Sequence, residues 1–219
     1  GYCGTNEAMK EKIIIALDVS SRDEALQLVH ELHGLVGMFK VGGQLFTACG
    51  PEIVREIIAA GGRVFLDLKF HDIPNTVAGA VESARELGVA MATVHTLGGP
   101  AMLAAAARSA GEGLGLVGVT VLTSHTAASY AAAVGRGVVA LEEEVSRLAL
   151  ESVRAGLRGL VCSPHEVALV RPKLRPQAWI VVPGIRRAGD AAGDQQRTAT
   201  PAQAARAGAT HLVVGRPIL

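Results

Sequence analysis

Short apolar segments, β-branched or Leu-rich, alternate with longer amphipathic segments along most of this 219-residue chain. The longer segments are rich in Ala, Glu and Arg, with apolar residues at helical spacing. Each opens near a Pro, Ser, Asp or Asn, residues that favour the first positions of a helix. The pattern therefore predicts repeated βα units on a parallel sheet.

Eight strands are expected, over residues 13–18, 38–41, 63–69, 91–95, 116–122, 159–162, 179–182 and 211–214. Helices are expected over residues 22–32, 51–60, 76–87, 100–110, 138–155 and 201–207, with a further short helix after Pro164. Eight strands with intervening helices in one domain of this size favour an α/β fold of the (β/α)8 TIM-barrel type. An open doubly wound sheet remains the alternative, because the number of strands does not show that the sheet closes.

The two ends of the chain are expected to differ from the rest. Residues 1–12 are interpreted as an N-terminal extension, and residues 13–219 as a single barrel domain. Only the residues from Gly215 to Leu219 follow the last expected strand. The final helix of the barrel is therefore expected to be missing from this sequence.

The composition narrows the class of protein. With 49% hydrophobic and 3% aromatic residues, the chain can form one sizeable core packed mainly from Val, Ile, Leu and Ala. The net charge of +1, with Lys and Arg dispersed along the chain, argues against a nucleic-acid partner. No apolar run reaches the roughly 18 residues of a membrane span. Cys3, Cys49 and Cys162 have unrelated spacings that suggest no zinc site, and a cytoplasmic location is expected.

Charged residues stand at the ends of three expected strands. Asp18 ends the first strand and Lys40 the second. Asp67 and Lys69 end the third strand, where their spacing places both side chains on one face. Barrel enzymes carry their chemistry at the carboxyl ends of the strands, so these four alternating charges are expected to converge on one rim, with Asp72 close by in the sequence. Because desolvated charges are unfavourable unless paired, we interpret the cluster as catalytic; ordinary solvated strand ends are the alternative.

Two glycine-containing segments follow the last two expected strands, at residues 182–186 and 213–217. Barrels commonly bind phosphate there through backbone N–H groups, glycines and an arginine. Gly215 allows close approach of the backbone, and the guanidinium of Arg216 can bind two phosphate oxygens, which predicts a phosphorylated substrate. The polar loop over residues 186–200 is expected to be a mobile lid. A surface arginine in a turn and a loop without function are the alternatives.

A series of motifs runs along the chain from Ile13 onward: Ala16-Leu17-Asp18-Val19, Phe39-Lys40-Val41-Gly42, Leu66-Asp67-Leu68-Lys69-Phe70-His71-Asp72-Ile73-Pro74-Asn75-Thr76, Thr120-Val121-Leu122-Thr123-Ser124, Pro183-Gly184-Ile185-Arg186, Ala192-Gly193-Asp194-Gln195 and Gly215-Arg216-Pro217. In order and spacing these motifs resemble those of the bacterial orotidine 5′-phosphate decarboxylase family. The D-x-K-x-x-D spacing alone also occurs in related 3-keto-gulonate-phosphate decarboxylases and hexulose-phosphate synthases. The longer run that contains it is far more specific.

The resemblance implies a homodimeric enzyme without cofactor or metal that converts orotidine 5′-phosphate to UMP and CO2 in de novo pyrimidine biosynthesis. It implies that Lys69 donates a proton to C6 of the pyrimidine, beside Asp67 and Lys40. Asp72 of the partner subunit would complete this catalytic group. The implied substrate contacts are Asp18, Lys40, Asp67, Thr76, Thr123, Arg186, Gln195, Gly215 and Arg216.

Two other functions remain open at this point. The first is a metal-dependent sugar-phosphate decarboxylase or aldolase-type enzyme on the same barrel, which a chelator would inactivate. The second is a barrel that binds phosphate without catalysis, which would give no reason for a lysine between two aspartates.

Overall fold

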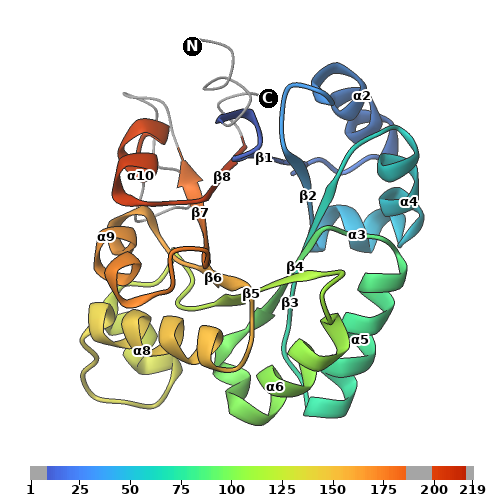
Figure 1. Ribbon diagram of the computed structural model, residues 1–219. Coiled ribbons are helices and arrows are strands. Elements are labelled where there is room, and N and C mark those ends of the chain that lie inside the picture. Colours follow the sequence, from blue (N-terminus) through green and yellow to red (C-terminus); the bar gives the residue numbers. More distant parts are fainter. Residues whose placement is uncertain (1–8, 186–198, 216–219) are drawn as a thin grey trace.

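The computed structural model describes residues 9–185 and 199–215, which form a closed barrel of eight parallel strands in the order β1 to β8 (Figure 1). The strands are β1 (Ile13–Ala16), β2 (Met38–Gly42), β3 (Val64–Phe70), β4 (Met91–His95), β5 (Gly115–Val119), β6 (Gly159–Val161), β7 (Trp179–Ile185) and β8 (His211–Val214). Strand β1 pairs with β8 as well as with β2, which closes the sheet. The predicted TIM barrel is confirmed, and the open doubly wound sheet is wrong.

The helices lie outside the ring of strands (Figure 1). They are α2 (Arg22–Leu32), α3 (Gly43–Cys49), α4 (Glu52–Ala59), α5 (Pro74–Glu86), α6 (Gly99–Ala110), α7 (Ala127–Ala133), α8 (Leu141–Arg154), α9 (Val167–Val170) and α10 (Pro201–Ala207), with 3-10 turns at η1 (Thr96–Gly98), η2 (Pro164–Glu166) and η3 (Arg171–Lys173). Local signals set several starts. Ser21 caps α2 by accepting a hydrogen bond from the backbone of Glu24, and Thr200 caps α10 in the same way.

Some predicted boundaries were wrong, and three of the differences change where Asp18, Lys40 and Asp67 lie relative to the ends of their strands. Strand β1 ends at Ala16, so Asp18 lies beyond the strand and does not end it. Lys40 and Asp67 lie within β2 and β3, which continue past them. Strand β5 ends at Val119, and the expected strand over 116–122 is therefore too long. Helices α3 and α7 were not predicted.

Alternation along the strands divides the apolar residues into two clusters. The smaller cluster takes side chains from every strand except β6, whose Val161 packs against it, and it fills the barrel interior. Its members are Ile14, Ala16, Met38, Phe65, Met91, Val117, Val181 and Val213, with Ala90, Val161 and Trp179 packed against them. The larger cluster lies between the outer face of the strands and the helices. The interior is therefore a packed core, on which any site at the end of the barrel must rest.

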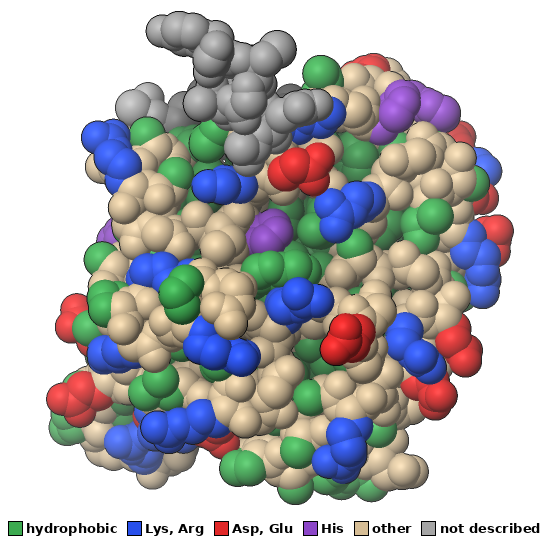
Figure 2. Space-filling view, in the orientation of Figure 1, with side chains coloured by type: hydrophobic (Ala, Val, Ile, Leu, Met, Phe, Trp, Pro, Cys, Tyr) green, Lys and Arg blue, Asp and Glu red, His purple; other side chains and the backbone are tan. Residues whose placement is uncertain are grey.

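Charges of both signs are interspersed on the face of the molecule shown in Figure 2. On this face Lys and Arg side chains stand near Asp and Glu side chains and do not form one large basic patch. Within residues 9–185 and 199–215, no helix is both long enough and apolar enough to cross a membrane.

A buried carboxylate anchors the long segment between β5 and α8. Glu144 is 6% exposed, and its oxygens accept hydrogen bonds from the Tyr130 hydroxyl at 2.9 Å and from Arg147 Nη2 at 2.8 Å. Arg136 lies 3.3 Å from the same carboxylate. Because Tyr130 lies on α7 and Glu144 on α8, these bonds tie the two helices together.

Replacement of this carboxylate should destabilise the fold in a pH-dependent way. The hydrogen bond from Arg147, opposed by burial and aided by Tyr130, lowers the pKa of Glu144 to about 2. A lowered pKa in the folded state contributes stability that is present above the unfolded pKa of about 4.5 and is lost as the pH falls towards 2. In urea unfolding at pH 7, the free energy of unfolding of Glu144→Gln should therefore be about 1–3 kcal/mol lower than that of wild type. This difference should become smaller below pH 4.5.

The exposed residue next to Glu144, Glu143, supplies the control for this prediction. Glu143→Gln, on the same helix, should change the free energy of unfolding by less than about 0.5 kcal/mol at pH 7 and at pH 2.5. A stability difference for Glu144→Gln that is equally large at pH 7 and at pH 2.5 would contradict the electrostatic explanation.

Candidate active site

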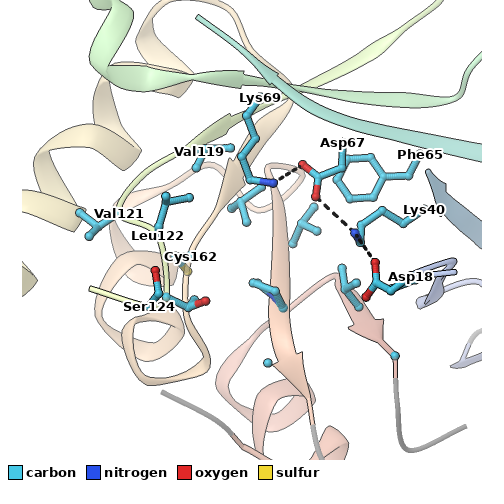
Figure 3. Close-up of a pocket in the computed structure, with 18 residues that line it drawn as sticks. Asp18, Lys40, Phe65, Asp67, Lys69, Val119, Val121, Leu122, Ser124 and Cys162 are labelled. Carbon is cyan, nitrogen blue, oxygen red and sulfur yellow. Dashed lines mark hydrogen bonds and ion pairs between the residues drawn. The ribbon is translucent and has the colours of Figure 1, made fainter. Parts of the chain in front are cut away.

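A pocket of about 350 Å³ opens at the carboxyl ends of the strands, above the apolar interior of the barrel. One wall carries the charged residues Asp18, Lys40, Asp67 and Lys69, and the opposite wall is largely apolar (Figure 3). A volume of this size is within the range of pockets that bind small molecules. This is the end of a barrel at which enzymes of this fold carry their active sites.

The charged wall is a continuous chain of alternating signs (Figure 3). Lys40 Nζ lies 3.5 Å from Asp18 Oδ1 and 3.6 Å from Asp67 Oδ2. The other oxygen of Asp67, Oδ1, accepts a hydrogen bond from Lys69 Nζ at 2.9 Å. The predicted convergence of these four charges is confirmed by these distances.

Strand alternation explains how Lys40 and Asp67 reach the pocket. Lys40 follows Met38 by two residues on β2, and Asp67 follows Phe65 by two residues on β3. Because residues two apart on a strand share a face, both charges point inward above the apolar side chains of the interior. Lys40 is paired in register with Phe65 across the two strands, which sets the height of the charges above the core.

Lys69 reaches Asp67 through an irregular backbone. It has a φ of +50°, and among the described residues it is the only non-glycine with positive φ. The pairing of β3 with β4 shifts register between Leu66 and Phe70, the interval that contains Lys69. A non-glycine residue in the left-handed region is strained by about 1–2 kcal/mol, and such strain is concentrated at functional sites.

Opposing influences act on the buried carboxylate at the centre of the chain. Asp67 is 13% exposed, and burial alone would raise its pKa. The positive charges of Lys40 and Lys69, with hydrogen bonds from Lys69 and Thr93, outweigh burial and lower the pKa of Asp67 below its usual value. Asp67 is therefore a carboxylate at neutral pH, held between two ammonium groups.

The remaining walls of the pocket carry few charges. Val119 of β5 and Val161 of β6 line the apolar side, followed by Thr123 and Ser124 from the segment after β5. Gly184 and Gly215 line the edge formed by the ends of β7 and β8. A Cβ atom on Gly215 would lie 3.6 Å from Asp18 Oδ2, which is an ordinary contact distance, so the edge at Gly215 adjoins the charged wall.

Six of the predicted site residues line this one pocket: Asp18, Lys40, Asp67, Lys69, Thr123 and Gly215. Asp72 and Thr76 are exposed and are not among the residues that line it. The Oδ1 atom of Asp72 accepts a hydrogen bond from the backbone of Ile73 at 2.6 Å. Arg186, Gln195, Arg216 and nearly all of the expected lid lie outside the described residues.

Thr93 and His95 contribute to the site and were not predicted. The Thr93 hydroxyl donates to Asp67 Oδ1 at 3.0 Å from the neighbouring strand β4. The sequence contained no clear signal for it, because threonine is common in strands and the register of β4 against β3 was unknown.

His95 ends β4 and stacks on His71, with ring centroids 5.3 Å apart. Burial lowers the pKa of His95 to about 4, and the neighbouring His71 and Lys69 act in the same direction. The His95 ring is thus uncharged at neutral pH and adds no positive charge beside Lys69.

Among residues 9–185 and 199–215, no group of three or more His, Cys, Asp or Glu side chains is arranged to hold a metal ion.

The closed barrel and the charged pocket at its carboxyl end define the protein as a (β/α)8-barrel enzyme. Residues 11–219 match the model of a family described as the orotidine 5′-phosphate decarboxylase / HUMPS family. The chain belongs to this family, and the predicted family resemblance is confirmed.

Relatives from several bacteria carry the name orotidine 5′-phosphate decarboxylase. The protein of Moorella thermoacetica is 49% identical over 219 residues, covering 95% of this chain and 86% of the relative. That of Anaeromyxobacter sp. strain K is 51% identical over 208 residues, covering 95% and 91%. The crystal structure of orotidine 5′-phosphate decarboxylase from Lactobacillus acidophilus superposes with a TM-score of 0.82 at 32% identity, covering 94% of this chain and 90% of that one.

Proposed function

We propose that the protein decarboxylates orotidine 5′-phosphate to UMP and CO2 in the cytoplasm, without a cofactor or metal, in de novo pyrimidine biosynthesis. The observation that carries this proposal is the chain of alternating charges from Asp18 through Lys40 and Asp67 to Lys69. The names of the relatives support the same substrate.

The proposed reaction needs a cation close to the reacting carbon. When the bond between C6 and the carboxylate breaks, the electron pair stays on C6 in an orbital that cannot delocalise into the ring. The Lys69 ammonium donates its proton to this carbon and becomes a neutral amine, which water then reprotonates. A unit charge about 4 Å from C6 contributes on the order of 4 kcal/mol at an effective dielectric of about 20.

One lysine is not sufficient for the whole effect, since enzymes lower barriers by roughly 8–23 kcal/mol. We assign the remainder to binding energy from parts of the substrate far from C6, which holds the ring against the charges and removes water. In this assignment Asp18 and Lys40 bind the ribose hydroxyls and Thr123 contacts the pyrimidine. Gly215 lies at the phosphate end, with Arg186, Gln195 and Arg216 as further phosphate contacts.

Asp67 has two proposed roles that can act together. Its carboxylate keeps Lys69 close and charged, which the 2.9 Å hydrogen bond supports. It also repels the carboxylate of the bound substrate, and this repulsion disappears when neutral CO2 leaves.

The direct test is an assay of the purified chain with orotidine 5′-phosphate. The loss of ultraviolet absorbance should proceed at the same rate with and without a chelator. Inhibition by the chelator would favour a metal-dependent sugar-phosphate enzyme of the same barrel type. Tight nucleotide binding without any turnover would instead favour a non-catalytic phosphate-binding barrel.

We further propose a homodimer in which Asp72 and Thr76 act in the partner's site. Both residues are exposed and lie outside the pocket of their own chain, and the adjacent Ile73 is 66% exposed. Because both side chains are exposed on their own chain, they are available for contact with a second copy.

Mixing two inactive variants tests this arrangement. Lys69→Ala and Asp72→Ala subunits, co-expressed with different tags, should recover about a quarter of wild-type activity, since half of the dimers are mixed and each mixed dimer has one complete site. As a control, Lys69→Ala co-expressed with Asp67→Asn should recover nothing, because both residues belong to the same chain's site. Failure of the first pair to regain activity would contradict the shared site.

A further inference from the structure

The hydroxyl of Thr93 lies between the backbone of Lys69 and the side chain of Asp67. Thr93 is 1% exposed and stands in the middle of β4. Its Oγ1 accepts a hydrogen bond from the Lys69 backbone N–H at 2.9 Å and donates to Asp67 Oδ1 at 3.0 Å. The same Oδ1 atom accepts the hydrogen bond from Lys69 Nζ. Both ends of Lys69 are thus connected to one carboxylate oxygen, directly and through Thr93.

The register shift between the strands explains why this hydroxyl is needed. Leu66 pairs with Ala92, and the next pair is Phe70 with Val94, so β3 advances farther than β4 over this interval. Thr93 is the residue between the two paired positions of β4. The Lys69 N–H, displaced from the regular ladder by the positive φ, binds the Thr93 side chain where a strand would otherwise provide a carbonyl.

The two hydrogen bonds suit a hydroxyl and few other groups. A hydroxyl can accept one hydrogen bond and donate another, so the polarity runs from the Lys69 N–H through Thr93 to the carboxylate. Such a chain strengthens its members through mutual polarisation, and the bond to the ionised carboxylate is the stronger of the two. The site is also buried, where a missing partner is most costly.

We propose that Thr93 is a positioning residue, whose hydroxyl holds the strained Lys69 backbone and orients Asp67 so that the ammonium is presented to the substrate. This inference rests on the proposed function of Lys69 and Asp67. Thr93 is not among the residues that line the pocket, so it acts through these two side chains and not through contact with substrate.

Three variants separate positioning from simple packing. Thr93→Val keeps nearly the same volume and removes the hydroxyl, and kcat should fall about 10- to 100-fold, the range for loss of a hydrogen bond to a charged group. The dissociation constant for UMP should change less than about threefold, because the pocket lining is retained. Thr93→Ser keeps the hydroxyl and should restore kcat to within about threefold of wild type. Thr93→Ala repeats the test should the valine variant not fold.

Thr96→Val is the matched control. Thr96 is also 1% exposed and follows the same strand, but its hydroxyl is bonded to Ser152 and not to the charged residues. This variant should lose a comparable amount of thermal stability while kcat stays within about threefold of wild type.

A second readout does not depend on activity. Removal of a hydrogen bond to the carboxylate should raise the pKa of Asp67, which is measured from the pH dependence of its carboxyl carbon resonance in isotope-labelled protein. The resonance should titrate at higher pH in Thr93→Val than in wild type or in Thr93→Ser, and unchanged behaviour in all three would overturn the inference.

The kinetic results also distinguish a positioning role of Thr93 from a packing role. A near-normal kcat in Thr93→Val, or an equal loss in Thr96→Val, would reduce Thr93 to a packing residue. Either result can be obtained while Lys69→Ala is inactive, in which case only the role of Thr93 is rejected. A fully active Lys69→Ala would instead reject the proposed mechanism itself.

Discussion

Lys69→Ala is expected to lower kcat by about 10⁵-fold or more, the magnitude seen when a group that is used chemically in the reaction is removed. The Lys69 ammonium is the last of the four linked charges. It is bonded to Asp67 at 2.9 Å, and Lys69 lines the pocket. Without it the new lone pair has neither a compensating charge nor a proton donor. Initial rates with orotidine 5′-phosphate, measured at high enzyme concentration, give the value.

Lys69→Arg separates the two contributions of the lysine. Arginine keeps the positive charge but does not give up a proton near neutral pH. If proton donation is essential, this variant should be nearly as inactive as Lys69→Ala. If charge alone is sufficient, it should recover a large part of kcat.

The controls test whether the Lys69 variants keep the fold and the binding pocket. Both variants should bind UMP and unfold cooperatively, because Asp67 keeps its second partner, Lys40. Lys173→Ala, whose side chain is bonded to Ser146 away from the pocket, should retain wild-type turnover. Turnover of Lys69→Ala within tenfold of wild type would show that Lys69 is not the proton donor.

Asp67→Asn is expected to have the second largest effect, a fall in kcat of about 10³-fold or more, on the scale of general acid–base contributions. The substitution keeps the shape of the side chain and removes its charge. Lys40 Nζ and Lys69 Nζ share this carboxylate; without its charge Lys40 keeps Asp18, whereas Lys69 loses the carboxylate to which it is bonded. We expect Lys69 to move away from its present position, because its 2.9 Å hydrogen bond to a charged acceptor is lost.

The Michaelis constant shows which role of Asp67 dominates. If the carboxylate mainly repels the substrate, Asp67→Asn should bind orotidine 5′-phosphate more tightly while kcat falls. If it mainly holds Lys69, kcat should fall with little change in binding. Asp23→Asn, which changes an exposed residue on α2, should match wild type in both quantities. A normal kcat in Asp67→Asn would exclude both roles.

Sequence reasoning predicted the bounds of some helices and strands and missed two helices entirely. The predicted bounds of α2 and β4 are those of the structure. Helix α2 has apolar residues at helical spacing and starts directly after Ser21, which favours a helix start, and β4 is a short apolar run. The seven-residue helices α3 and α7 were missed. Helix α10 has the same length and was predicted with its bounds, because Pro201 marks its start. Helices α3 and α7 have no proline at the start and depend on tertiary packing, through the buried Leu45 and Tyr130.

The site was predicted in part, for a related reason. A shared motif and the rule that barrel enzymes act at the carboxyl ends of strands were sufficient to identify Asp18, Lys40, Asp67 and Lys69. The rule placed Lys40 and Asp67 at strand ends, whereas they lie inside strands that continue beyond them. Strand length depends on pairing with neighbours, which periodicity along one segment does not show.

The amino-acid sequence by itself determined the alternating fold, the family and the identity of the charged groups, because periodicity and motifs are properties of residues close together along the chain. Tertiary structure alone decided that the sheet closes, since closure depends on β1 meeting β8 from opposite ends of the chain. It also decided the register shift, the positive φ of Lys69 and the contact of Thr93 with Asp67. These features arise from packing and hydrogen bonds between neighbouring strands, whose relative positions no local pattern specifies.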